Sequence, residues 1–163
     1  MKNPNEAFFV AIQAGCIPHA IGMPGEAKSA IIQSFANASG RNLHTMIGSI
    51  CDPADIGGYP ALGKSKSGVE YMRMVPPQWA VRCLEGKWIV FFDELTTVGL
   101  SVQAAMLRIM AEGWVGEFEL PKTIWMCAAS NPPGIAANGT ELEVPMANRM
   151  IHPPWIVTGK HDA

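Results

Sequence analysis

The adjacent residues Lys28 and Ser29 end a short loop, and their types suit the binding of phosphate groups. The loop runs Gly-Met-Pro-Gly-Glu-Ala-Lys-Ser over residues 22–29, after an apolar run and before a helical pattern. A strand–loop–helix context of this kind surrounds phosphates with main-chain N–H groups at a helix N-terminus. Lys28 would then contact the β- and γ-phosphates, and Ser29 would place its hydroxyl on Mg²⁺. The candidate nucleotide-binding residues are Gly22, Met23, Pro24, Gly25, Glu26, Ala27, Lys28, Ser29 and Ala30.

Ala27 departs from the pattern of such loops, which have glycine before the lysine. Glycine there frees the backbone and lets a phosphate approach closely, and the extra methyl group either strains the loop or is tolerated. A second interpretation of the segment stays open, namely a Gly-Pro turn followed by an amphipathic helix.

Asp93 and Glu94 directly follow five apolar residues at 88–92. An unbroken apolar run is expected of a strand buried on both faces of a parallel sheet. Unpaired carboxylates are costly to bury, so we expect both acids at the strand's carboxyl end. Asp93 would hold Mg²⁺ there, and Glu94 would orient and polarise a water molecule. The alternative is a strand that runs into a surface loop capped by two acids.

Asn131 closes another apolar segment, residues 123–129, and its amide could hydrogen-bond the attacking water or a γ-phosphate. An Asn-Pro pair is also a common start of a turn, and that alternative stays open.

The elements that would position these residues alternate along the chain. Apolar patterns predict strands at residues 16–21, 43–47, 88–92 and 123–129, and helices at residues 4–14, 28–38, 76–84 and 102–111. Residues 52–67, rich in Gly, Pro and Ser, are expected to form a loop or a loose hairpin. Alternating strands and helices predict a parallel α/β sheet, in which ligands bind beyond the carboxyl ends of the strands.

Composition supports one ordinary domain. The 163 residues are 48% apolar and 16% charged, without an apolar run long enough to span a membrane. A net charge of −2 argues against a protein built mainly to coat nucleic acid. No secretory signal is evident, so we expect a cytoplasmic protein. The scattered cysteines predict buried thiols, with no disulfide framework and no structural metal.

Together these motifs resemble the ATPase core of an AAA+ protein, most closely the MoxR-like branch. The resemblance covers residues 9–155 and rests on three motifs in order: the loop ending in Lys28-Ser29 (Walker A), Phe92-Asp93-Glu94 (Walker B) and Asn131 (sensor 1). Residues 102–108 and 147–150 extend it.

The resemblance implies a P-loop NTPase three-layer sandwich with a five-stranded parallel sheet of order 5-1-4-3-2. It also implies hairpin insertions, expected at residues 57–74 and 114–122. Residues 1–163 would form a single α/β core subdomain. The family carries a helical lid after this core, and Pro153, Pro154 and Gly159 lead us to expect no lid here.

The implied activity is Mg²⁺-dependent binding and hydrolysis of ATP in a ring, usually a hexamer. Arg149 is similar in position to the arginine that stabilises the transition state in a neighbouring subunit. Its alternative role is an ion pair with an acid such as Glu143. A partner with a von Willebrand A-type domain is also implied. The hairpins of related rings contact the substrate, although a solvated loop would equally explain the cations of the first hairpin.

Two other functions remain open. A nucleotide-binding interaction module without hydrolysis is suggested by Ala27 and by the expected lack of a lid. A small-molecule kinase also uses a phosphate loop, but the Asp93-Glu94 pair is better suited to activating water.

Overall fold

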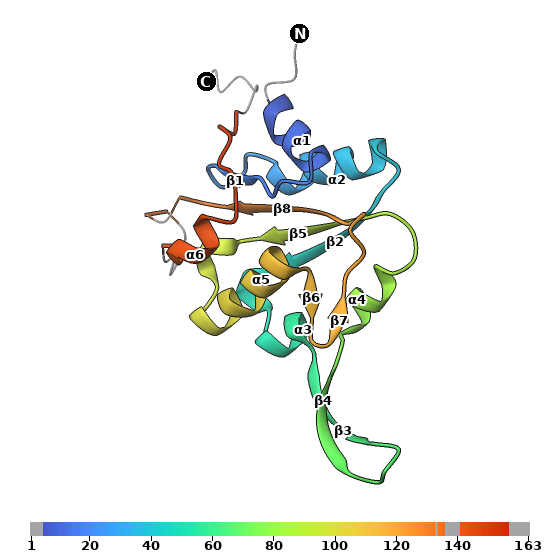
Figure 1. The fold of residues 1–163 in the computed structure, drawn as a ribbon. Helices are drawn as coiled ribbons and strands as arrows, with labels where there is room; N and C mark the ends of the chain where they lie inside the picture. Colours follow the sequence, from blue (N-terminus) through green and yellow to red (C-terminus); the bar gives the residue numbers. More distant parts are fainter. Residues whose placement is uncertain (1–4, 133, 136–140, 157–163) are drawn as a thin grey trace.

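Four parallel strands form the central sheet of the computed structural model, which describes residues 5–132, 134–135 and 141–156. They are β1 (His19–Ile21), β2 (Asn42–Ile47), β5 (Trp88–Asp93) and β8 (Trp125–Ser130). Their order is β1-β8-β5-β2, and every neighbouring pair is parallel (Figure 1). The predicted parallel α/β class is confirmed.

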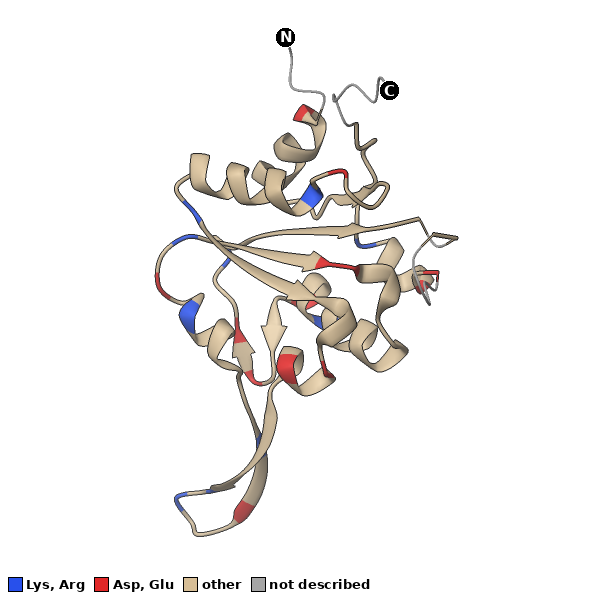
Figure 2. Ribbon diagram, turned by 180° about the vertical axis from the view of Figure 1, so that it is seen from behind, with Lys and Arg blue, Asp and Glu red and all other residues tan. Residues whose placement is uncertain are grey.

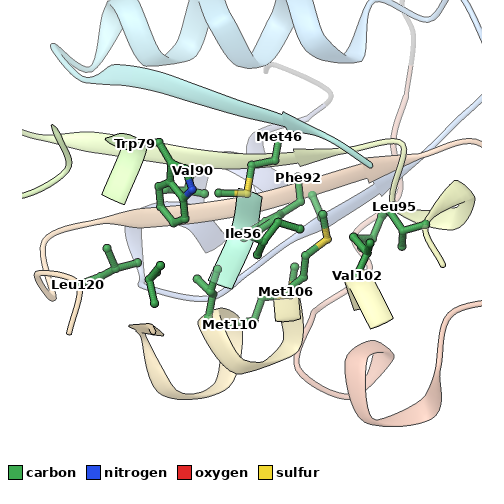
Figure 3. Packing of buried hydrophobic residues seen from close by; sticks show 14 of the residues in the cluster. Met46, Ile56, Trp79, Val90, Phe92, Leu95, Val102, Met106, Met110 and Leu120 are labelled. Carbon is green, nitrogen blue, oxygen red and sulfur yellow. The ribbon is translucent and has the colours of Figure 1, made fainter. Parts of the chain in front are cut away.

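Helices cover both faces of the sheet, because β5 has two apolar faces. Ile89 and Phe91 of β5 pack in a cluster with α1 (Glu6–Gln13) and α2 (Lys28–Ala38). Val90 and Phe92 face the other way, toward α5 (Leu100–Glu112). Figure 1 shows α1 and α2 on one side of the sheet and α5 on the other. Figure 3 shows the second cluster, including Met46, Ile56, Trp79, Val90, Phe92, Leu95, Val102, Met106, Met110 and Leu120.

Short elements and two hairpins complete the chain. The helical pieces are η1 (Gly48–Ile50), α3 (Pro53–Gly57), α4 (Gln78–Arg82), η2 (Leu95–Thr97) and α6 (Val144–Ala147). One hairpin pairs β3 (Tyr59–Lys64) with β4 (Glu70–Val75), and the other pairs β6 (Trp114–Val115) with β7 (Phe118–Glu119). The first projects from the body of the molecule and carries charges of both signs (Figures 1 and 2). No helix in the described ranges is long and apolar enough to cross a membrane.

The prediction of a fifth strand is wrong for the described residues. At the free edge of β1 there is a single parallel bridge, between Pro18 and Ile151. The N–H of His19 donates to the carbonyl of Ile151 at 2.8 Å, and the N–H of Ile151 donates to the carbonyl of Ile17 at 3.0 Å. Two prolines follow at residues 153 and 154, and proline has no N–H with which to extend the ladder. The other four strands stand in the predicted order.

Three local features also differ from the predictions. The strand expected at residues 16–21 keeps only its last three residues, after Pro18. The segment 52–67 is more ordered than expected, since it holds both α3 and β3. The prediction of buried thiols holds for Cys83 and Cys127, but Cys16 is exposed; all four cysteines are free.

Two non-glycine residues in the described ranges, Ala27 and Glu94, have positive φ angles, of 52° and 57°. Ala27 lies at the N-cap of α2 in the left-handed region, which favours glycine. The methyl group therefore strains the loop in front of Lys28.

We expect Ala27→Gly to raise the free energy of unfolding by up to about 1 kcal/mol. A left-handed alanine costs roughly 1–2 kcal/mol, and the greater freedom of glycine in the unfolded chain offsets part of the gain. Urea denaturation measures the change. Gly25→Ala is the matched control, because φ is +84° there and an added Cβ meets no atom within 4 Å. It should destabilise the chain, and a loss of stability in Ala27→Gly would contradict the assigned strain.

His19 is the buried histidine of β1, with 1% of its surface exposed. Burial, and secondarily the charge of nearby His152, lowers the pKa of His19 to about 4. The histidine pKa in the unfolded chain is near 6.5. Between about pH 4 and pH 6.5, His19 is therefore protonated in the unfolded chain and neutral in the folded chain.

The contribution of neutral His19 to the free energy of unfolding should consequently be fully present at pH 7. It should fall as the pH drops from about 6.5 toward 4. The difference between the folded and unfolded pKa values of His19 corresponds to about 3 kcal/mol of stability. The test compares urea unfolding of the wild type and His19→Gln at pH 7 and pH 4.5. The carboxylates contribute alike to both proteins, so the variant should lose less stability on acidification; parallel losses would refute the assignment.

Candidate functional site

A cavity of about 370 Å³ lies at the carboxyl ends of β1, β8 and β5. Parallel alignment brings these three ends to one edge of the sheet, where α/β folds bind their ligands. The lining residues are Pro24, Gly25, Glu26, Ala27, Lys28, Ser29, Ala30, Asp93, Glu94, Ser130 and Asn131. Every site residue predicted from the sequence belongs to this set or adjoins it, with the exception of Arg149.

Lys28 is buried in the cavity wall, with 8% of its surface exposed. Its ammonium group donates to the carbonyls of Gly22 at 2.7 Å and Met23 at 2.9 Å, and to Oδ1 of Asn131 at 3.1 Å. These three acceptors use all three N–H donors of the group. Burial lowers the pKa of Lys28, while the carboxylates of Glu26 and Asp93 oppose that shift.

Ser29 and Asp93 meet in the lining of the cavity. The hydroxyl of Ser29 donates to Oδ2 of Asp93 at 2.6 Å, although the two residues are 64 positions apart in the chain. Oδ1 of Asp93 accepts the N–H of Glu94 at 2.9 Å, which fixes the carboxylate plane. A hydroxyl beside a carboxylate offers the hard oxygen ligands that Mg²⁺ prefers.

Glu94 lines the cavity in the left-handed backbone conformation described above. Its carbonyl accepts both the N–H and the hydroxyl of Thr97, at 3.0 and 2.8 Å. Gly48 allows this turn to lie close by, since a Cβ at Gly48 would approach the carbonyl of Glu94 to 2.9 Å and collide with Val98. Strained non-glycine residues cluster at functional sites, and Ala27 and Glu94 line the same cavity.

The side chain of Glu26 bonds back to the backbone of its own loop. Its Oε2 accepts the N–H of Met23 at 2.8 Å, and a side chain at Gly22 would collide with this carboxylate. A side chain at position 22 would therefore displace the Glu26 carboxylate from its bond to Met23. Glu26 also adds a third carboxylate to the cavity, beside Asp93 and Glu94.

Arg149 lies outside the cavity. It lines a separate groove of about 630 Å³ between α5 and α6, together with residues such as Leu107, Arg108 and Pro145. The alternative pairing of Arg149 with Glu143 is wrong, because the single ion pair in the part of the chain described by the structure joins Arg108 and Glu112 at 3.4 Å. Action of Arg149 on a neighbouring subunit stays a prediction.

Three polar residues near the cavity were not predicted from the sequence. Ser130 lines the cavity and shares a hydrogen bond of 2.8 Å with Nε2 of His19. The hydroxyl of Thr96 donates to the carbonyl of Asn131 at 3.3 Å. His19 and Ser130 interrupt apolar strands, and a polar residue within such a strand is the signal that could have revealed them.

The donor set fits a nucleotide with a divalent cation. The first N–H groups of α2, from Lys28, Ser29 and Ala30, have no partner within the helix and lie at the cavity. The cavity holds one cation and three carboxylates, so a polyphosphate would be repelled unless a metal ion came with it. The hydroxyl of Ser29 and the carboxylate of Asp93 supply ligands for that ion.

The sequence matches no protein-family model and no curated protein. Solved structures nevertheless share its fold. A protein of Cytophaga hutchinsonii assigned as an ATPase is 18% identical, with a TM-score of 0.58 over 93% of this chain. A mutant of Thermotoga maritima RuvB is 13% identical, with a TM-score of 0.62 over 95%. A structure described as the Thermotoga maritima RuvB Holliday junction branch migration motor is 14% identical, with a TM-score of 0.60 over 93%.

The chain spans 46%, 45% and 43% of those three structures, which is less than half the length of each. At identities this low the likeness shows the fold alone, since one fold serves many functions. The chain therefore has the α/β fold of this ATPase and of RuvB, with a parallel sheet flanked by helices.

Proposed function

We propose that this chain is the nucleotide-binding α/β core subdomain, residues 1–163, of an AAA+ ATPase of the MoxR-like branch. The observation that carries the proposal is the convergence of Lys28, Ser29, Asp93, Glu94 and Asn131 on one cavity. These residues come from three parallel strands and from the loop expected to bind phosphate. The structural likeness to an ATPase and to RuvB supports the proposal at the level of the fold.

ATP or ADP would bind with its phosphates against the loop of residues 22–29. The ammonium group of Lys28 would exchange its main-chain acceptors, Gly22 and Met23, for phosphate oxygens. Ser29 and Asp93 would hold Mg²⁺, which offsets charge on the phosphates when bound. The three carboxylates of the cavity make binding dependent on that cation.

Hydrolysis would be assisted by two side chains. The carboxylate of Glu94 accepts a proton from the attacking water, which raises its nucleophilicity toward the γ-phosphorus. The amide of Asn131, already bonded to Lys28, orients that water and holds the ammonium group near the transferred phosphoryl group. Water then adds to phosphorus as the bond to the leaving ADP breaks.

Ring formation is part of the proposal. The exposed Arg149, in its groove away from the cavity, is available to reach the cavity of an adjacent copy and stabilise transition-state charge there. The resemblance further suggests a hexamer, a cytoplasmic location and a partner with a von Willebrand A-type domain. The projecting β3–β4 hairpin would then offer a contact for a remodelled substrate.

A second candidate function, nucleotide binding without hydrolysis, is favoured by the backbone of Ala27. Its left-handed conformation strains the loop directly before Lys28. Mg-ATP binding with no phosphate release at any protein concentration would support this second function over the first.

Glu94→Gln should lower the rate of ATP hydrolysis by about 10²–10⁴-fold, because the amide cannot accept the proton from water. Affinity for Mg-ATP should be retained, since Glu94 is not proposed to bind phosphate. Phosphate release measures the first quantity and calorimetric titration the second. Glu119→Gln, at the exposed residue of β7, is the matched control and should behave as wild type. Equal hydrolysis in wild type and Glu94→Gln would remove Glu94 from the mechanism.

Lys28→Met should weaken Mg-ATP binding by roughly tenfold or more, because a charge-assisted hydrogen bond to phosphate contributes about 1.5–3 kcal/mol. Lys87→Met, an exposed lysine at the opposite end of the sheet, is the control. Thermal unfolding without nucleotide shows whether each variant is folded. Unchanged affinity in a folded Lys28→Met protein would place the phosphates elsewhere.

A further inference from the structure

His19 of β1 connects its strand to β8 through Ser130, which lines the cavity. It pairs with Ala128 in the β1–β8 register. Ser130 comes two residues later and therefore lies on the same face of β8. Nε2 of His19 and Oγ of Ser130 share a buried hydrogen bond of 2.8 Å. This bond lies directly before Asn131, where β8 ends.

The position of Asn131 depends on this strand end. Its amide oxygen accepts from Lys28 at 3.1 Å, and its carbonyl accepts from Thr96 at 3.3 Å. Both contacts are with elements outside β8, so a shift of the strand end would lengthen them. Ser130, with 2% of its surface exposed, is the last residue of β8 before Asn131.

The other side of His19 contacts the segment 147–152, which carries Arg149. The ring of His152 lies edge-on to the ring of His19, with centroids 5.3 Å apart and an interplanar angle of 67°. Nε2 of His152 shares a hydrogen bond of 3.2 Å with the carbonyl of Ala147 at the end of α6. The backbone N–H of His19 also donates to Ile151.

The imidazole of His19 has only one of its two ring nitrogens in a hydrogen bond within the described residues. Nδ1 of His19 is buried and has no hydrogen-bond partner within the described residues. An unsatisfied buried polar atom opposes folding and calls for an explanation other than stability.

We propose that His19 is a positioning residue that couples the cavity to the segment 147–152. Its bond to Ser130 fixes Asn131, and its ring and backbone contacts fix the segment that carries Arg149. Filling of the cavity and placement of Arg149 are thereby linked, and the linkage acts in both directions. The ligand of the cavity rests on the proposed function; the positioning of the strand end does not.

The first measurement is amide hydrogen exchange in the nucleotide-free chain. His19→Leu and Ser130→Ala each remove the bond and should speed exchange at Ser130 and Asn131 about tenfold. His19→Gln keeps a side-chain donor and should stay within about twofold of wild type. The double variant His19→Leu/Ser130→Ala should be no faster than either single variant, because both remove the same bond. Additive effects, or equal exchange in Leu and Gln variants, would overturn the positioning role.

The second measurement uses Mg-adenylyl imidodiphosphate, an ATP analogue that is not hydrolysed. Its binding should slow exchange in residues 147–152 of wild type and of His19→Gln. In His19→Leu this protection should be lost, and affinity should fall about five- to tenfold. His152→Leu should retain exchange rates at Ser130 close to wild type and still lose the protection.

The outcomes separate the two proposals. Binding by wild type with full protection in His19→Leu would refute the coupling and leave the proposed function standing. No binding by wild type would refute the proposed function and the coupling to a nucleotide. Exchange at Ser130 and Asn131 would then still decide the positioning role.

Discussion

The burial of β5 on both faces is the constraint on which the rest of the structure depends. Ile89, Val90, Phe91 and Phe92 are each 0% exposed, so layers of helices must cover both sides of the sheet. Such a strand can place its charged residues only at its end, where Asp93 is the last residue of β5 and Glu94 follows it. Because the neighbouring β8 and β1 run in the same direction, their own polar ends reach the same edge.

At that edge of the sheet, one lysine and three carboxylates line the same cavity. Within the described residues, the ammonium group of Lys28 hydrogen-bonds to neutral oxygens, two carbonyls and one amide, and forms no ion pair with a carboxylate of the cavity. Asp93 instead accepts from Ser29 and from a backbone N–H. The positive charge and the negative charges thus line one cavity without forming an ion pair, an arrangement that suits the proposed ligand of phosphate and metal ion. Exchanging neutral acceptors for phosphate oxygens costs less than breaking ion pairs.

Local patterns in the sequence predicted much of this arrangement, and contacts between distant strands account for what was missed. The apolar run before Asp93 and the loop before Lys28 are contiguous signals, and the structure brings these residues to one cavity. The prediction of a fifth strand was wrong because the prolines that follow Ile151 limit the pairing to a single bridge with Pro18. The His19–Ser130 bond depends on the register of β1 against β8, and the need for glycine at Gly48 depends on how closely η1 approaches the turn at Glu94. Both features depend on segments that are far apart in the sequence, so local patterns do not predict them.

The pairing of β1 with β8 has a consequence for how the protein is made. β1 ends at Ile21, and its partner in the sheet begins at Trp125. At about 5–20 residues per second of synthesis, roughly 5 to 20 seconds pass before the partner of β1 emerges. Until then the first strand has helices to pack on but no strand beside it, and closing so long a loop is among the slow steps of folding. The segment that ends in Lys28 therefore leaves the ribosome well before β8, the strand that pairs with β1 and carries Ser130 to the same cavity.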